Sequence, residues 1–202
     1  MPAIWPAFIT SVGGFLDDPS EGKTHTDTAE KISSEYHKAV KTAQVTLHAT
    51  LVSVQPPYIP IKMAIEKCLN DIRESEGEPQ LFHFTDWAAK TVSYWMSVQY
   101  QIVPFHPIAM ATSTGTVGIP VPVTNVTTVG GIPPALANDL LTAFTHPKSS
   151  VPYGIPFATK LSTAFINHLT TVQGLHTHVV TAGSPITPVP LGPIPYPWAG
   201  LV

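Results

Sequence analysis

Proline limits where this chain can be helical. The 202 residues include 22 prolines, about twice the usual share. Proline inside a helix removes a backbone hydrogen bond and clashes with the preceding turn, so helices must fall between the prolines. Apolar residues spaced three and four apart predict helices over 27–51, 60–76, 85–100, 134–146 and 156–173. The expected fold class is mainly α, a small bundle of about five helices with extended arms and a few short strands.

The end of the first predicted helix is ambiguous. Asp27 and Glu30 form a start that resembles a capping box, and an apolar stripe at helical spacing follows them. From Val45 onward, apolar and polar residues alternate as they do in a strand. We favour a helix as far as Leu51, with a strand over 45–54 as the alternative.

Three segments outside these helices are expected to be arms, of which the N-terminal one is extended or short helical and the other two are extended. They are the apolar N-terminal residues 1–26, the Val/Thr/Gly/Pro-rich residues 103–132 and the proline-rich residues 184–202. A helical region over 27–102 and a helical pair with a short strand over 133–183 complete one domain. Because proline donates no backbone hydrogen bond, we expect the C-terminal arm to become ordered only by docking on another subunit or a distant part of its assembly.

Charge is distributed unevenly along the chain. Only 11% of the residues are charged, against roughly 25% in an ordinary soluble domain, and residues 91–202 contain only Asp139, Lys148 and Lys160. A monomer normally keeps a charged surface for solubility, so the neutral half indicates surface covered by partner subunits. The net charge of −3 argues against nucleic acid as the main ligand, and no apolar run is long enough to predict a membrane span.

Aromatic residues in the two terminal arms are the expected partner contacts. They are Trp5 and Phe8 near the N-terminus, and Tyr196 and Trp198 near the C-terminus. Burying one indole removes on the order of 200 Å² from water, so such residues anchor an arm efficiently. The N-terminal arm is expected to dock either on the core of its own chain or on a neighbour.

Two histidines form the candidate metal site. His176 and His178 make an H-x-H pair, and residues two apart in a strand project to the same face. Both imidazoles can then reach one ion, although a zinc site needs further ligands. The remaining ligands are expected from His168, His25, His106 or symmetry mates, and the alternative is a pair of ordinary histidines.

The chain shows no catalytic motif. A G-x-S-x-G elbow, a G-x-x-x-x-G-K-[ST] loop and a G-x-G-x-x-G turn are all absent, so no catalytic residue and no cofactor-binding residue are predicted. Cys68 is the only cysteine and lies at helical spacing from Ile65 and Ile72. We expect it to be a buried thiol rather than a nucleophile.

The order of segments resembles the small virion structural proteins of tailed bacteriophages, especially tail, baseplate or neck subunits. The residues that carry the resemblance are the apolar start with Trp5, the helix with Thr28-Ala29, Ile32, Tyr36 and Ala39-Val40, the pair Tyr94-Trp95, the arm around Gly130-Gly131, and the ending Tyr196-Pro197-Trp198-Ala199-Gly200. The resemblance implies a place in a virion, with other structural proteins as partners.

The sequence therefore predicts a non-enzymatic structural subunit of a symmetric assembly, whose partners are its own copies and other proteins of that assembly. Two alternatives stay open. One is a monomeric module that binds peptides or glycans through exposed Trp and Tyr, and the other is an enzyme whose site the sequence does not reveal.

Overall fold

The computed structural model describes residues 4–19, 22–41, 51–54, 56–102, 107–112, 115–120, 123–145, 153–182 and 189–199. In the strands it describes the course and pairing of the backbone. The helices are α1 (Trp5–Asp17), α2 (His25–Val40), α3 (Ile59–Glu74), α4 (Thr85–Met96), α5 (Pro133–Phe144) and α6 (Gly154–Thr171), with a short 3-10 helix η1 (Leu81–Phe84). The strands are β1 (Leu51–Val54), β2 (Gln99–Ile102), β3 (Pro107–Thr112), β4 (Gly115–Pro120), β5 (Val123–Val129), β6 (Gln173–Ala182) and β7 (Val189–Ala199).

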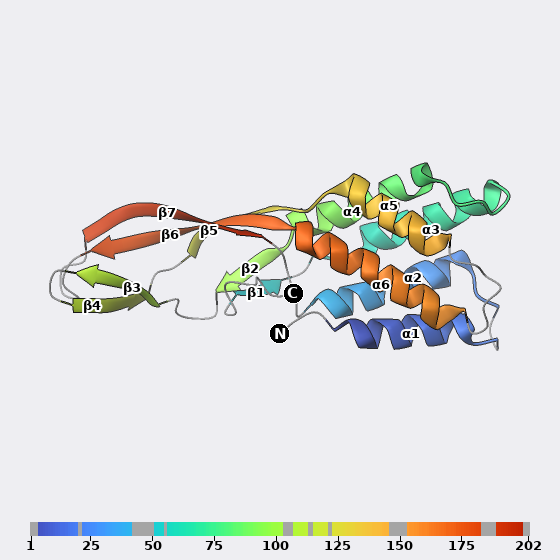
Figure 1. Ribbon diagram of the computed structural model, residues 1–202, viewed down its shortest axis with the longest axis horizontal. Helices are drawn as coiled ribbons and strands as arrows, with labels where there is room; N and C mark the ends of the chain where they lie inside the picture. Colours follow the sequence, from blue (N-terminus) through green and yellow to red (C-terminus); the bar gives the residue numbers. More distant parts are fainter. Residues whose placement is uncertain are drawn as a thin grey trace.

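The helices form a bundle, and the strands extend from one of its ends (Figure 1). The prediction of a mainly α fold built on a small helical bundle is confirmed. Among the described residues, the helices are neither long nor apolar enough for any of them to cross a membrane.

The N-terminal segment predicted as an arm contains helix α1, which packs on the rest of the bundle. Pro6 occupies the second position of the helix, where its missing N–H breaks no helical hydrogen bond. The backbone of α1 comes very close to the start of α6, because a Cβ on Gly13 would lie 2.9 Å from the Ile155 Cα. At the same crossing, the Asp17 carboxylate accepts a hydrogen bond from the Gly154 N–H at 2.6 Å, which places an anion at the positive end of α6.

Aromatic side chains make the centre of the bundle. The Phe165 ring of α6 lies 4.5 Å from the Tyr36 ring and 5.9 Å from the Phe8 ring, measured between centroids. Trp95 is fully buried, and its indole N–H donates to the Tyr36 hydroxyl at 2.7 Å. Since a buried indole N–H needs an acceptor, this bond fixes α4 against α2.

Helix α2 begins earlier and ends earlier than predicted. Its N-cap is Thr24, whose hydroxyl accepts from the Asp27 N–H while the Asp27 carboxylate accepts from the Thr24 N–H. The capping box is therefore Thr24 with Asp27, not Asp27 with Glu30. The expectation of a helix as far as Leu51 is wrong, because β1 begins there and pairs with β2. Residues 42–50 lie outside the described part of the chain.

The other helix ends agree with the prediction to within a few residues, with one exception. Gln99 and Tyr100, placed by the sequence at the end of the third helix, belong instead to strand β2. Met96 is the last residue of α4. The sequence positions of Tyr94, Trp95 and Tyr100 did not indicate that the helix ends at Met96.

The segments predicted as extended arms include paired strands. β3 and β4 form an antiparallel hairpin, and β5, β6 and β7 form a three-stranded antiparallel sheet in that order. The short strand expected after the helical pair is present as β6. The C-terminal segment pairs with β6 of its own chain, whereas the sequence analysis expected it to become ordered by docking on another subunit or a distant part of its assembly.

The chain passes between the bundle and the strands at five places among the described elements. These lie before and after β1, between α4 and β2, between β5 and α5, and between α6 and β6. At the β5–α5 link, the His168 Nε2–H donates to the Gly130 carbonyl at 2.9 Å. Gly131 has φ of +96° and a Cβ there would lie 2.5 Å from the same nitrogen, so only glycine fits at this position.

Cys68 lies in the core as predicted, with 1% of its surface exposed. Burial raises the pKa of its thiol to about 12, so almost no reactive thiolate forms at neutral pH. We expect a thiol reagent to label the folded chain far more slowly than the chain in denaturant, as measured by mass spectrometry over time. Equal rates in the two conditions would contradict this placement.

Candidate binding site

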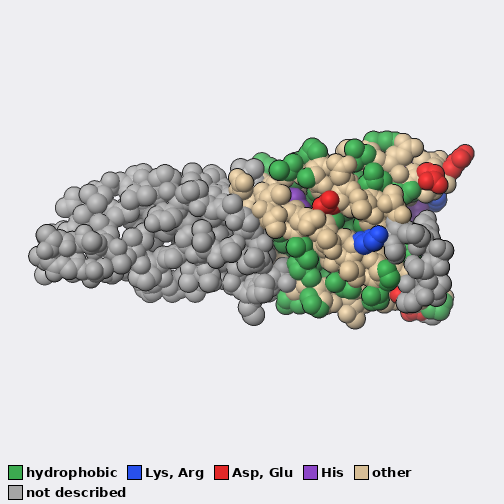
Figure 2. Space-filling model, in the orientation of Figure 1, with side chains coloured by type: hydrophobic (Ala, Val, Ile, Leu, Met, Phe, Trp, Pro, Cys, Tyr) green, Lys and Arg blue, Asp and Glu red, His purple; other side chains and the backbone are tan. Residues whose placement is uncertain are grey.

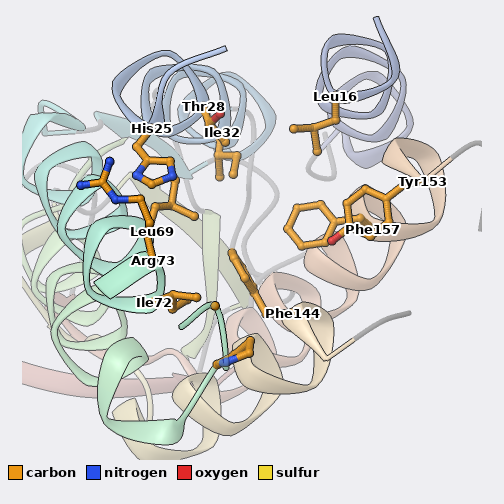
Figure 3. Close-up of a pocket in the computed structure, with 12 residues that line it drawn as sticks. Leu16, His25, Thr28, Ile32, Leu69, Ile72, Arg73, Phe144, Tyr153 and Phe157 are labelled. Carbon is orange, nitrogen blue, oxygen red and sulfur yellow. The ribbon is translucent and has the colours of Figure 1, made fainter. Parts of the chain in front are cut away.

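A cleft of about 340 Å³ opens at the end of the bundle remote from the strands (Figures 1 and 3). It lies where α1, α3 and α5 end and where α2 and α6 begin. Its walls are made by Leu16, His25, Thr28, Ile32, Leu69, Ile72, Arg73, Gly77, Pro79, Phe144, Tyr153 and Phe157. Pockets that hold small ligands commonly span about 300 to 1,000 Å³, so the cleft is at the small end of that range.

The polar side of the cleft carries His25 and Arg73, which lie next to each other in Figure 3. The capping box at Thr24 fixes His25 at the first position of α2. The His25 Nδ1–H donates to the Asn70 amide oxygen at 2.8 Å, because that oxygen can only accept. The ring is thereby tied to α3, and with the proton on Nδ1 its Nε2 can accept a hydrogen bond but cannot donate one.

Arg73 stands in the last turn of α3 and is exposed. It is the only arginine of the chain, and it makes no ion pair with any residue that the structure describes. Its guanidinium offers five N–H donors in a planar fork that matches a carboxylate or phosphate. A ligand in the cleft would therefore meet a free, permanently charged donor.

The apolar side is a wall of aromatic rings from α5 and α6. The Tyr153 ring stacks on the Phe157 ring at 5.5 Å, and the Phe157 ring meets the Phe144 ring edge-on at 5.0 Å. Leu16 faces this wall from α1 (Figure 3). The aromatic wall and the two polar groups thus lie on opposite sides of the cleft (Figure 3).

Other polar clusters in the described part of the chain are internal supports. The His83 ring accepts from the Gln80 N–H at 3.0 Å and therefore carries its proton on Nε2, which donates to the Ser75 hydroxyl at 3.0 Å. Ser75 in turn donates to the Asp71 carbonyl. This chain of bonds holds the turn after α3, which forms one edge of the cleft.

The predicted metal ligands His176 and His178 both lie on β6, the central strand of its sheet. The backbone pairs them with Tyr196 and Ile194 of β7, while the positions of their side chains fall outside the description. Of the further ligands proposed, His168 is committed to the Gly130 carbonyl and His25 to Asn70, and position 106 is not described. No group of three or more possible metal ligands occurs among the described residues, and the metal site remains a prediction.

The predicted partner contacts fall into two groups. Phe8 is 1% exposed and sits in the core of its own chain, which is the first of the two docking alternatives for the N-terminal arm rather than a contact with a partner. Trp5 is partly buried and stacks on Phe165 at 6.1 Å. Tyr196 and Trp198 belong to strand β7, where the backbone alone is described.

The sequence analysis did not identify the cleft or its polar pair. A local signal existed only for His25, as a residue in the first turn of a helix. Comparison of the chain with models of protein families, with curated proteins and with solved structures finds no match.

Proposed function

We propose that this chain is a structural subunit of a symmetric assembly and that its strands are the part covered by neighbouring subunits. The observation that carries the proposal is the absence of Asp, Glu, Lys and Arg from all seven described strands. Charged side chains lie on the helical bundle instead, as Figure 2 illustrates for one face.

An uncharged β extension is a poor surface for an isolated protein. Proteins usually protect the edges of their sheets with charged residues, and they keep charge on surface that faces water. A neutral sheet that reaches beyond its bundle instead favours contact with other protein surfaces. The strands therefore suit a position between subunits, while the charged bundle suits contact with water.

Proline gives the two edges of the three-stranded sheet different properties. The prolines of β7 that pair with β6 are Pro190, Pro193, Pro195 and Pro197. Their partners are every second residue of β6 from Leu175 to Thr181. The irregularity in pairing after Val180 places Pro190 on the same edge of β7 as the other three prolines. Because proline has no N–H and can join a ladder only with its nitrogen turned outward, the outer edge of β7 lacks four donors. β5 carries no proline, so pairing with a neighbour is favoured on the β5 side.

The finer proposal is that the assembly is the virion of a tailed bacteriophage, in its tail, baseplate or neck. Support comes from the resemblance in segment order described above. Detection of the chain in purified particles, at a constant ratio to the other particle proteins, tests this placement. Absence of the chain from such particles would contradict it.

Charges placed on β5 are expected to prevent assembly without unfolding the bundle. The double change Thr127→Lys and Thr128→Lys puts charge on both faces of the strand, because successive residues point to opposite faces. The native mass should fall toward the 21.7 kDa of one chain, with helicity by circular dichroism unchanged. Sedimentation velocity at matched concentrations gives the measurement.

The matched control is Thr163→Lys with Thr170→Lys, two exposed positions on α6. It adds the same charge to the bundle and should leave the assembled mass unchanged. A parent chain that sediments as a monomer at every concentration would contradict assembly from its own copies and favour the monomeric binding module. Equal loss of assembly in both double variants would contradict the assignment of the interface to the strands.

A further inference from the structure

We propose that the cleft at the end of the bundle binds a small amphiphilic carboxylate, with its apolar body against the aromatic wall and its head at Arg73. This inference is independent of the proposed assembly. The cleft lies at the end of the molecule remote from the strands, so assembly through the strands leaves it available.

The composition of the walls sets the class of ligand. Most of the described lining residues are apolar, and among them Arg73 is the only one with a permanent charge. None of these described residues is a carboxylate, so none of them neutralises the guanidinium. An apolar pocket with a few convergent polar groups is the usual form of a small-molecule site, and a single cation at its rim selects an anion.

The geometry of the polar side favours a carboxylate head. A guanidinium binds a carboxylate through two parallel N–H···O bonds. His25 stands beside Arg73 on the side of the cleft opposite the aromatic wall (Figure 3), and its ring is held in place by Asn70.

Acidic residues near the cleft do not occupy it. Glu74, Glu76 and Glu78 follow Arg73 in the sequence and are exposed, and none of them lines the cleft. Repulsion between exposed carboxylates and a ligand is screened over about 8 Å at physiological ionic strength.

The size of the cleft limits the apolar body to about one aromatic ring or a short acyl chain, since about 340 Å³ is available and drug-sized ligands take the upper part of the range. Phe144, Tyr153 and Phe157 present ring faces and edges to such a group. Octanoate is a suitable probe because it combines an eight-carbon chain with a single carboxylate.

The test is calorimetric titration of the full chain with octanoate, octanol, octylamine and octyl phosphate. Octanoate is expected to bind saturably and more tightly than octanol or octylamine. In the Arg73→Gln variant, octanoate affinity should fall at least tenfold, which corresponds to about 1.4 kcal/mol, while octanol affinity stays the same. Lys90→Gln is the matched control, because it removes one positive charge from an exposed position of α4 outside the cleft.

A second variant tests the apolar part of the site. Thr28→Phe on the wall of the cleft should fill part of its volume and abolish binding of octanoate and octanol alike. Methyl NMR of the parent chain should show ligand-induced shifts at Ile32 and Leu69, which line the cleft, and none at the exposed Ile166.

Three results would overturn the proposal. They are the absence of saturable octanoate binding, equal affinities for octanoate and octanol on the parent chain, and unchanged octanoate affinity in Arg73→Gln. Tighter binding of octyl phosphate than of octanoate would overturn the carboxylate assignment and identify a phosphate head instead. None of these outcomes depends on the native mass of the chain, so failure here is separable from failure of the proposed assembly.

Discussion

Replacement of Gly13 by alanine is expected to destabilise the chain by about 2 kcal/mol, whereas the same change at Gly14 should stabilise it by about 0.5 to 1 kcal/mol. The two residues are neighbours in α1. A Cβ at Gly13 would lie 2.5 Å from the Ile155 Cδ1 and 2.9 to 3.0 Å from backbone atoms of Ile155, while a Cβ at Gly14 would meet nothing within 4 Å. Backbone atoms at a helix crossing cannot move aside separately, so α1 must shift away from α6.

Urea unfolding of the two variants and the parent chain, followed by circular dichroism, gives the comparison. The helix propensity gained is the same at both positions, so the difference in unfolding free energy isolates the packing of α1 on α6. Similar changes in stability at Gly13 and Gly14 would contradict the packing of α1 on α6. They would favour the N-terminal arm that the sequence predicted.

Lowering the pH from 7 to 4 is expected to cost the folded chain about 3 kcal/mol through His168 alone. Burial lowers the pKa of this ring to about 4. Its Nε2–H donates to the Gly130 carbonyl, and its buried Nδ1 has no hydrogen-bond partner, so a second proton would find no acceptor. The unfolded chain takes up that proton near pH 6.5. Stability from this group is thus complete above pH 6.5 and declines as the pH falls toward 4.

His168→Gln is the informative variant, because the glutamine amide can still donate to Gly130 but does not titrate. Unfolding free energies measured from pH 7 to pH 4 should fall more steeply for the parent than for the variant. Burial also lowers the pKa of His37, with Lys41 as a second cause, so the variant should keep a shallower slope of the same sign. Parallel slopes for parent and variant would contradict the burial of a neutral His168.

The sequence predicted the helices that depend on local pattern and missed those that depend on packing. Apolar spacing and flanking prolines located α3, α5 and α6 to within a few residues. Helix α1 lies in the segment that the sequence predicted as an N-terminal arm. Pro6 falls in the first turn, where proline is compatible with a helix. The sequence carries no sign that Gly13 matches the path of α6.

The strand at Leu51 shows a second limit. The residues before it fit both the alternating pattern of a strand and the apolar stripe of a helix. Local spacing alone therefore could not decide between strand and helix. Pairing with β2 decides for a strand at this position, and that partner lies about fifty residues away. The C-terminal segment is similar, since its prolines fit a strand only when all of them turn to the same edge of β7.

The candidate site was not predictable for a related reason. His25, Asn70 and Arg73 come from two helices, and the aromatic wall comes from two others. Each residue alone reads as an ordinary part of its helix. The structure places Phe144 and Tyr153 partly at the surface, on the wall of the cleft.

The repeated passage of the chain between bundle and strands has a mechanical consequence. A domain tethered through one flexible linker can swing freely, but here short links join α4 to β2, β5 to α5 and α6 to β6. A force applied to the tip of the sheet would load several helices at once, and the antiparallel ladders would resist it along their length. A displacement at the tip of the sheet would thus be transmitted to the packing of α4, α5 and α6.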